Sequence, residues 1–168
     1  GLSGTSLGTV SQISATVFDV RVSSGSGSGT LRLDFVDDDS VTDLAGNVLG
    51  GTGAQSHTGD ELFNLDRSAP VIVFTSQPPS LTGSTSASTS FTVTESETSV
   101  AFLECRLDAA AFSACSSPFA VSSLTQGTHT IEVRATDVAG NVGSGSVSWL
   151  VDLTPPSLTL TSTPPSPS

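Results

Sequence analysis

Hydrophobic and polar residues alternate with a period of two along most of the chain, which is typical of half-buried β-strands. The run at 128–135, THTIEVRA, is the clearest example, with Ile131 and Val133 on one side and Glu132 and Arg134 on the other. No apolar stripe with a helical period of 3.6 exceeds two turns. The pattern therefore predicts an all-β chain.

The stretch from 69 to 154 carries a full set of strand signals, and a β-sandwich needs about seven strands. In the third predicted strand either Phe102 or Leu103 faces inward, because the alternation alone does not fix the register. Trp149 falls in the last strand. The predicted strands are 71–76, 88–94, 100–107, 111–115, 119–122, 128–136 and 145–151.

The residues before this stretch predict a smaller set of four or five strands. Two alternating runs, 15–22 and 29–36, flank the linker SSGSGSG, and this pattern predicts a β-hairpin. Residues 37–47 are turn-like, and a last strand is expected at 61–66. This set is too small for a free-standing sandwich, so we interpret it as the later part of a module. Phe18, Val20 and Val22 share one side of the first run, and Leu31, Leu33 and Phe35 of the second are expected to face inward.

One segment of the chain occurs twice. The run 65–80, LDRSAPVIVFTSQPPS, aligns without a gap with 151–166, VDLTPPSLTLTSTPPS, at a period of 86 residues. A fixed period of this length predicts tandem β-sandwich modules, here with boundaries at 1–68, 69–154 and 155–168. The prolines fix the backbone and predict a stiff joint between modules. The joint residues are Asp66, Pro70, Asp152, Pro155 and Pro156.

Charge and composition narrow the set of partners. The chain has 16 acidic and 5 basic residues and a formal charge of −11, which argues against binding to nucleic acid because that needs a clustered positive surface. No stretch approaches the ~20 apolar residues of a membrane-spanning helix. The Ser/Thr/Pro-rich segments are compatible with O-linked glycans. The partners expected are neighbouring modules or identical subunits.

The two cysteines, Cys105 and Cys115, flank a short connection between two predicted strands. A hairpin can bring such residues to disulfide distance. The alternatives are two free thiols, or half of a metal site in which His129 is the one candidate histidine. A disulfide would indicate an oxidising compartment, and hence an extracellular or cell-surface location.

The motif D-x-A-G-N-V occurs at 43–48 and again at 137–142. Asp, Gly and Asn are typical turn residues, so the motif predicts a turn before the last strand of each module. A second interpretation adds calcium at the joint, with Asp137 and Asp152 as one pair of ligands and Asp43 and Asp66 as the other. The acidic run 37–39 does not follow the EF-hand loop.

Nucleophilic catalysis has little support in the sequence. His57 lies in a Gly/Ser-rich loop and His129 at the start of a strand, and neither has a nucleophile-elbow context. No two carboxylates are singled out as a catalytic pair for glycoside hydrolysis. We therefore expect that the chain is not an enzyme.

The order of motifs in 71–156 resembles the Ig-like repeats of very large secreted and surface proteins of bacteria and algae. In those repeats, as here, Cys-x-Leu-Asp is followed by Phe-x-x-Cys, G-x-H-T, R-A-T-D-x-A-G-N and a closing D-x-T-x-P. The segment GTLRLDFVDDDSVTDLAGNVLGGTG resembles a second, cysteine-free variety of the same repeats. The resemblance implies tandem Ig-like β-sandwiches in adhesin stalks or filaments, with no catalytic residues. Antibody landmarks do not carry over, because Trp149 is in the final strand.

The sequence favours a structural module of an extracellular stalk, sheath or surface filament. The alternative is an adhesin module that recognises carbohydrate or protein through Phe112, Phe119 or the loop 48–59. An exposed cluster of aromatic residues would favour this alternative. The small first module predicts an open sheet edge, which a neighbouring subunit could complete by strand exchange unless upstream residues of the same chain do so.

Overall fold

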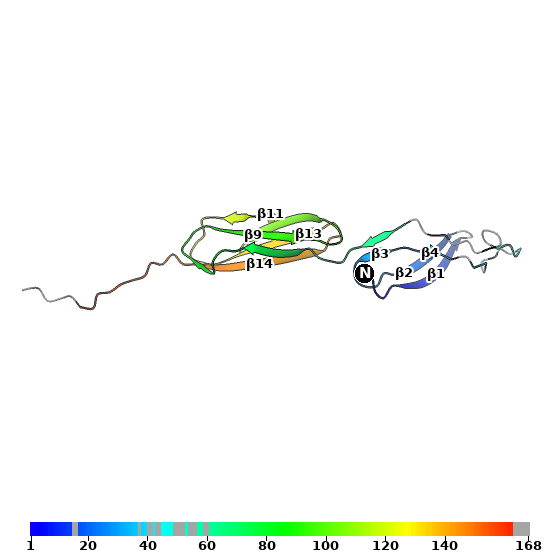
Figure 1. Cartoon of the computed structure of the whole chain (residues 1–168), viewed down its shortest axis with the longest axis horizontal. Helices are drawn as coiled ribbons and strands as arrows, with labels where there is room; N and C mark the ends of the chain where they lie inside the picture. Colours follow the sequence, from blue (N-terminus) through cyan, green and yellow to red (C-terminus); the bar gives the residue numbers. More distant parts are fainter. Residues whose placement is uncertain are drawn as a thin grey trace, which may run out of the picture. The chain divides into compact units, whose positions relative to one another are not determined.

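The computed structural model describes residues 1–14, 17–36, 38–39, 42, 45–48, 53, 57–58 and 61–162. The described chain is all-β, and it divides into two compact units. The first unit comprises 1–69 together with the short segments 95–99 and 137–141, and the second comprises 70–94, 100–136 and 142–168. In Figure 1, strands β1 to β4 belong to the first unit and β9, β11, β13 and β14 to the second.

The second unit is a sandwich of two sheets, with strand orders β11-β10-β13-β14-β8 and β12-β9-β7. All seven strands predicted from the alternation are present, and the structure adds the short β8, which pairs in parallel with β14. The strands are β7 (Val71–Ser76), β8 (Leu81–Thr82), β9 (Ala87–Thr94), β10 (Val100–Leu107), β11 (Ser113–Ala114), β12 (Phe119–Val121), β13 (Gly127–Asp137) and β14 (Val142–Val151).

The core of the second unit lies between its sheets. Ile131 and Val133 are fully buried, as the alternation predicts, and Trp149 is buried beside them. Leu103 packs against this cluster while Phe102 is exposed, which settles the register of β10. The other sheet contributes Phe91, with Ile72 and Phe74 packed against the cluster. Burial of large apolar side chains of this kind stabilises a fold by roughly 1.5–3 kcal/mol each.

The described strands of the first unit form three separate two-stranded sheets, β1-β2, β3-β6 and β4-β5. Their bounds are β1 (Ser6–Ser14), β2 (Val17–Ser23), β3 (Gly29–Leu31), β4 (Asp34–Phe35), β5 (His57–Thr58) and β6 (Phe63–Leu65). The predicted hairpin between 15–22 and 29–36 is wrong, because β2 pairs with β1 and β3 pairs with β6.

The glycine-rich linker explains the different pairing. Ser26, in the middle of the linker, exchanges two backbone hydrogen bonds of 2.9 Å with Ser3. The linker is therefore held against the start of the chain and does not form a tight turn between the flanking strands. β1 was not predicted because Leu7, Val10 and Ile13 are spaced by three residues and do not alternate.

No described side chain of 1–69 is buried. Phe18 is 56% exposed, Val22 and Leu33 are exposed as well, and Val20 and Leu31 are only half-buried. The side chain of Phe35 lies outside the described residues. The inward face expected for these strands is therefore apolar but uncovered.

Candidate functional site

The D-x-A-G-N turn at 137–141 connects β13 to β14 and is built around the Asp137 carboxylate. Its Oδ1 accepts a hydrogen bond from the Asn141 backbone N (2.8 Å), and its Oδ2 accepts one from Asn141 Nδ2 (2.9 Å). Gly140 has φ +92°, a backbone conformation that glycine adopts without strain. Burial raises the pKa of Asp137, but the hydrogen bonds from Asn141, Gly140 and Ala139 outweigh it, and the net pKa is lowered. Asp137 is therefore a buried anion.

Asp66, in the repeated joint segment, is also held on both carboxylate oxygens. Its Oδ1 accepts a hydrogen bond from the Ser68 backbone N (2.9 Å), and its Oδ2 accepts one from Thr98 Oγ1 (2.8 Å). The backbone carbonyl of Asp66 accepts a hydrogen bond from Asn141 Nδ2 (3.2 Å). The motif asparagine thus links the Asp137 turn to the joint segment.

These two aspartates and Glu95 form a carboxylate cluster, in which one oxygen from each residue lies within 4.8 Å of the others. Glu95 Oε1 accepts hydrogen bonds from the backbone N of Ser96 and of Glu97, whereas Oε2 is buried and has no hydrogen-bond partner. All three residues belong to the first unit. Carboxylate oxygens are the ligands that calcium prefers, so this donor set fits a divalent cation.

Sequence reasoning placed Asp66 and Asp137 at a joint but missed Glu95. No repeat marks Glu95, and its position depends on a tertiary contact in which the Val138 backbone N donates to the Ser99 carbonyl (3.0 Å). That contact holds the loop 95–99 beside the 137–141 turn. A single sequence carries no signal for such a contact.

The predicted pairing of Asp137 with Asp152 is not what the structure shows. In the β13–β14 ladder, Thr136 pairs with Val142 and Gly127 pairs with Val151, so the two aspartates lie at opposite ends of the hairpin. Ten paired residues separate them by roughly 30 Å. Asp152 Oδ1 accepts a hydrogen bond from the Thr154 backbone N instead (2.9 Å). Asp43 lies outside the described residues.

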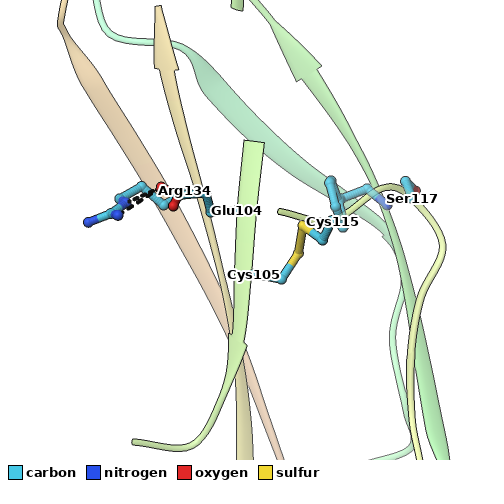
Figure 2. Close-up of a disulfide and its surroundings, with 6 residues drawn as sticks. Glu104, Cys105, Cys115, Ser117 and Arg134 are labelled. Atoms are coloured by element: carbon cyan, nitrogen blue, oxygen red, sulfur yellow. Dashed lines mark hydrogen bonds and ion pairs between the residues drawn. A yellow bond between two sulfur atoms is a disulfide. The ribbon is translucent and has the colours of Figure 1, made fainter. Parts of the chain in front are cut away.

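Cys105 and Cys115 form a disulfide, with their Cα atoms 5.7 Å apart. Free thiols and a cysteine metal site are thereby ruled out. Cys105 is fully buried in the core, while its neighbour Glu104 forms an ion pair with Arg134 (2.7 Å). Figure 2 shows the disulfide on one side of β10 and this ion pair on the other. The disulfide ties β10 to the segment that follows β11.

His129 is buried and has a partner on each ring nitrogen. Nδ1 lies 2.9 Å from Asp108 Oδ2, and Nε2 donates to the Thr125 carbonyl, also at 2.9 Å. The ring packs against Trp149, with 6.0 Å between the centroids. The hydrogen bond to Thr125 and then the one to Asp108 raise the pKa of His129, since both partners accept from the protonated ring. This arrangement stabilises the fold and leaves neither nitrogen as a general base.

The aromatic residues considered for ligand binding are largely covered. The guanidinium groups of Arg106 and Arg134 lie 4.5 and 4.2 Å from the Phe112 ring centroid, as in cation–π contacts. Both arginines are also held by ion pairs, Arg106 with Glu132 at 2.6 Å. Phe119 packs against the core. Most of the loop 48–59 lies outside the described residues.

The joint prolines occupy different environments. Pro70 is buried directly before β7, whereas Pro155 and Pro156 follow β14 and are exposed. In the part of the chain that the structure describes, there is no helix with the length and apolar character needed to cross a membrane.

Comparison with known proteins gives no match, either to a model of a protein family or to a curated protein.

Proposed function

We propose that this chain is a structural, non-catalytic part of an extracellular stalk, sheath or surface filament, in which Ig-like modules act as rigid spacers and assembly units. The observation that carries the proposal concerns the segment that occurs twice. Its first copy contains β7, whose Ile72 and Phe74 pack against the core of the disulfide-linked second unit. The repeated segment therefore begins a folded unit, and its recurrence after β14 supports an array of such units.

The state of the polar side chains in the second unit supports a mechanical function. Arg106, Arg134 and His129 each contact a carboxylate of the same unit. Side chains committed to ion pairs and hydrogen bonds stabilise a fold but are not available to activate a substrate. The disulfide supports an extracellular location, because such bonds persist in oxidising compartments.

We also propose that the cluster of Asp66, Glu95 and Asp137 binds a divalent cation, with calcium as the best fit to three carboxylates. The observation that favours it is Glu95 Oε2, which is buried among other carboxylates without a hydrogen-bond partner. A buried carboxylate oxygen with no donor is costly, and a cation would compensate that cost. The cation would rigidify the joint segment through Asp66.

The adhesin alternative has less support, because Phe112 lies under two arginine side chains and Phe119 packs against the core, so neither belongs to an exposed aromatic patch.

Immunogold labelling with an antibody against the second unit distinguishes the structural module from the adhesin. On unpermeabilised cells that produce the protein, we expect gold along extracellular filaments or stalks in negative-stain micrographs. Labelling that appears only in the interior, after the cells have been permeabilised, would contradict the proposed function. Labelling at filament tips only would favour the adhesin.

A further inference from the structure

The points at which the chain enters and leaves the second unit lie far apart along its strands. The chain enters at Pro70, which is buried. The Pro70 carbonyl lies against Gly143 at the start of β14, where a Cβ would not fit. The chain leaves after Val151, eight residues further along the same strand, or roughly 26 Å away, and Figure 1 shows it beyond β14 as an extended trace. Tension in the backbone therefore acts along the strands of this unit and not across them.

A short parallel ladder joins β8 to the C-terminal end of β14. The Leu150 backbone N donates a hydrogen bond to the Ser80 carbonyl at 2.9 Å. The Asp152 backbone N donates one to the Thr82 carbonyl, also at 2.9 Å. Val151, between the two donors, is fully buried. These bonds connect the part of the chain that enters the unit to the strand from which the chain leaves it.

The direction of this pairing decides how the bonds respond to tension. Pulling on the chain before Pro70 draws β8 towards the start of β14, while pulling beyond Asp152 draws β14 the other way. Because the two strands run in the same direction, they are forced to slide past each other. The bonds of a parallel ladder are evenly spaced, so they share this load and have to break together. Bonds between strands whose neighbouring ends are pulled apart break one after another, which needs less force.

Contacts of β7 share the load with the β8–β14 ladder. β7 lies in the other sheet and pairs with β9, and its Ile72 and Phe74 pack against the core. Pro78 and Pro79 occupy the connection from β7 to β8, and proline has no backbone N–H with which to continue the β7 ladder. The entering segment is thus fixed to both sheets, and it is drawn out of the unit only when its contacts with both are broken.

We infer that the β8–β14 ladder is a mechanical clamp, through which the second unit resists tension along the chain. The inference deepens the proposed function and rests on it in one respect, namely that the unit carries load within a stalk or filament. The disulfide between Cys105 and Cys115 lies outside the clamp, on β10 and the segment after β11. It acts after the clamp has opened, because it withholds the segment between the cysteines from extension.

Single-molecule force spectroscopy of the 168-residue chain, held at its two ends, tests the clamp. Chelator in the buffer removes any cation from the carboxylate cluster. Pro70 and Asp152 are 82 residues apart (152 − 70), of which the disulfide withholds 10. Unfolding of the second unit should therefore lengthen the chain by about 230 Å, and reductant should add roughly 30 Å to this step. The response to reductant identifies the step that belongs to the second unit.

A change in the point of attachment gives a control with a different direction of load. β13 begins where β14 ends, with Gly127 paired to Val151. One handle is attached at position 126 through Gln126→Cys, since Gln126 is exposed, and the other at the C-terminus. Pulling then separates neighbouring ends and peels β13 from β14 pair by pair. We expect unfolding at a lower force than when the chain is held at its two ends.

Substitution of Asp152 tests the clamp itself. Asp152→Pro removes the backbone N–H that donates to Thr82, whereas the matched control, Asp152→Ala, keeps this donor and removes only the side chain. Loss of one hydrogen bond from the clamp should raise the rate of unfolding under a fixed load about fivefold in the proline variant relative to the alanine variant. Trp149 fluorescence shows whether each variant is folded. If the proline variant does not fold, the comparison of attachment points decides.

Two results would overturn the clamp: equal unfolding forces in the two pulling directions, or the same unfolding rate under load for folded Asp152→Pro and Asp152→Ala. Neither result bears on the immunogold labelling, which tests the spacer function separately. Resistance to load in a protein whose labelling appears only after permeabilisation would overturn the spacer function and leave the clamp in place.

Discussion

The two units are built from the same kind of sequence but differ in what they bury. Both contain alternating strands rich in valine, leucine and phenylalanine. In the second unit two sheets face each other and enclose Ile131, Val133 and Trp149, whereas no described side chain of 1–69 is buried. Alternation makes a strand two-faced, but a core also requires a second layer to cover the apolar face. The described residues of 1–69 provide such apolar faces, but none of these residues is buried.

The units also differ in how their strands are held together. The second unit has a ten-residue β13–β14 ladder and a disulfide that links β10 to the segment after β11. The longest described ladder of the first unit, β1-β2, has register shifts at two places. Two-stranded sheets are marginal in water without packing on one face. The described sheets of the first unit therefore have fewer interactions to stabilise them than those of the second.

The largest expected difference between the units comes from one substitution made in each. Ile131→Ala removes a fully buried side chain and should lower the free energy of unfolding of the second unit by about 2–5 kcal/mol. Ile13→Ala, on the exposed β1, should change stability by less than about 0.5 kcal/mol. Chemical denaturation monitored by Trp149 fluorescence measures the first effect, and circular dichroism of the whole chain measures the second. Equal effects would contradict the contrast in burial.

Removal of the disulfide should have the next largest effect. The double variant Cys105→Ala with Cys115→Ala opens a loop with a sequence separation of 10. We expect the second unit to lose about 2–3 kcal/mol, mainly because the unfolded chain gains conformational freedom. Denaturant titration with and without reductant provides the measurement. In the double variant the reductant should have no further effect, which is the internal control.

Calcium should act on the first unit, where the carboxylate cluster lies. At 1 mM calcium, a site in the affinity range typical of extracellular modules would add about 0.4–1.4 kcal/mol. Differential scanning calorimetry with calcium and with chelator should show this gain, and Glu95→Gln should abolish it. Asp152→Asn is the matched control, because Asp152 lies at the far end of the β13–β14 hairpin. A melting profile unaffected by calcium would exclude the site.

The smallest expected effect is the pH dependence of the second unit, because Asp108, the partner of His129, is partly exposed. The pKa of His129 is raised above 6.5 in the folded state, so its stabilisation is present below pH 6.5 and is lost as the pH rises through the folded pKa. Burial raises the pKa of Asp108, but its contacts with His129 and Thr130 lower it below 3.8, so its contribution is lost in acid.

Thermal melting between pH 5 and 9 measures the effect of His129. We expect the melting temperature of the second unit to fall as the pH rises past 6.5, and His129→Gln to flatten that part of the profile. His129 is the one histidine of the second unit, since the other histidine of the chain, His57, lies in β5 of the first unit. A change in the melting of the second unit above pH 6.5 can therefore be assigned to His129. If the melting temperature falls with pH equally in the parent chain and in His129→Gln, a group other than His129 causes the pH dependence.

The sequence by itself determined the all-β class, the seven main strands of the second unit, the inward positions of Ile131 and Val133, and the close approach of Cys105 and Cys115. These features depend on period-two alternation and on short separations along the chain, and both are local properties. It also identified Asp66 and Asp137 as residues of the joint and of a turn.

Only the tertiary structure decided which strands pair in the first unit, that Glu95 joins Asp66 and Asp137, and that Asp152 lies at the opposite end of the β13–β14 hairpin from Asp137. It also decided that Leu103 rather than Phe102 faces the core. Each of these depends on contacts between residues distant in sequence. The alternating pattern predicts which residues share a face of a strand. Which element packs against that face depends on long-range contacts, which form only in the folded chain.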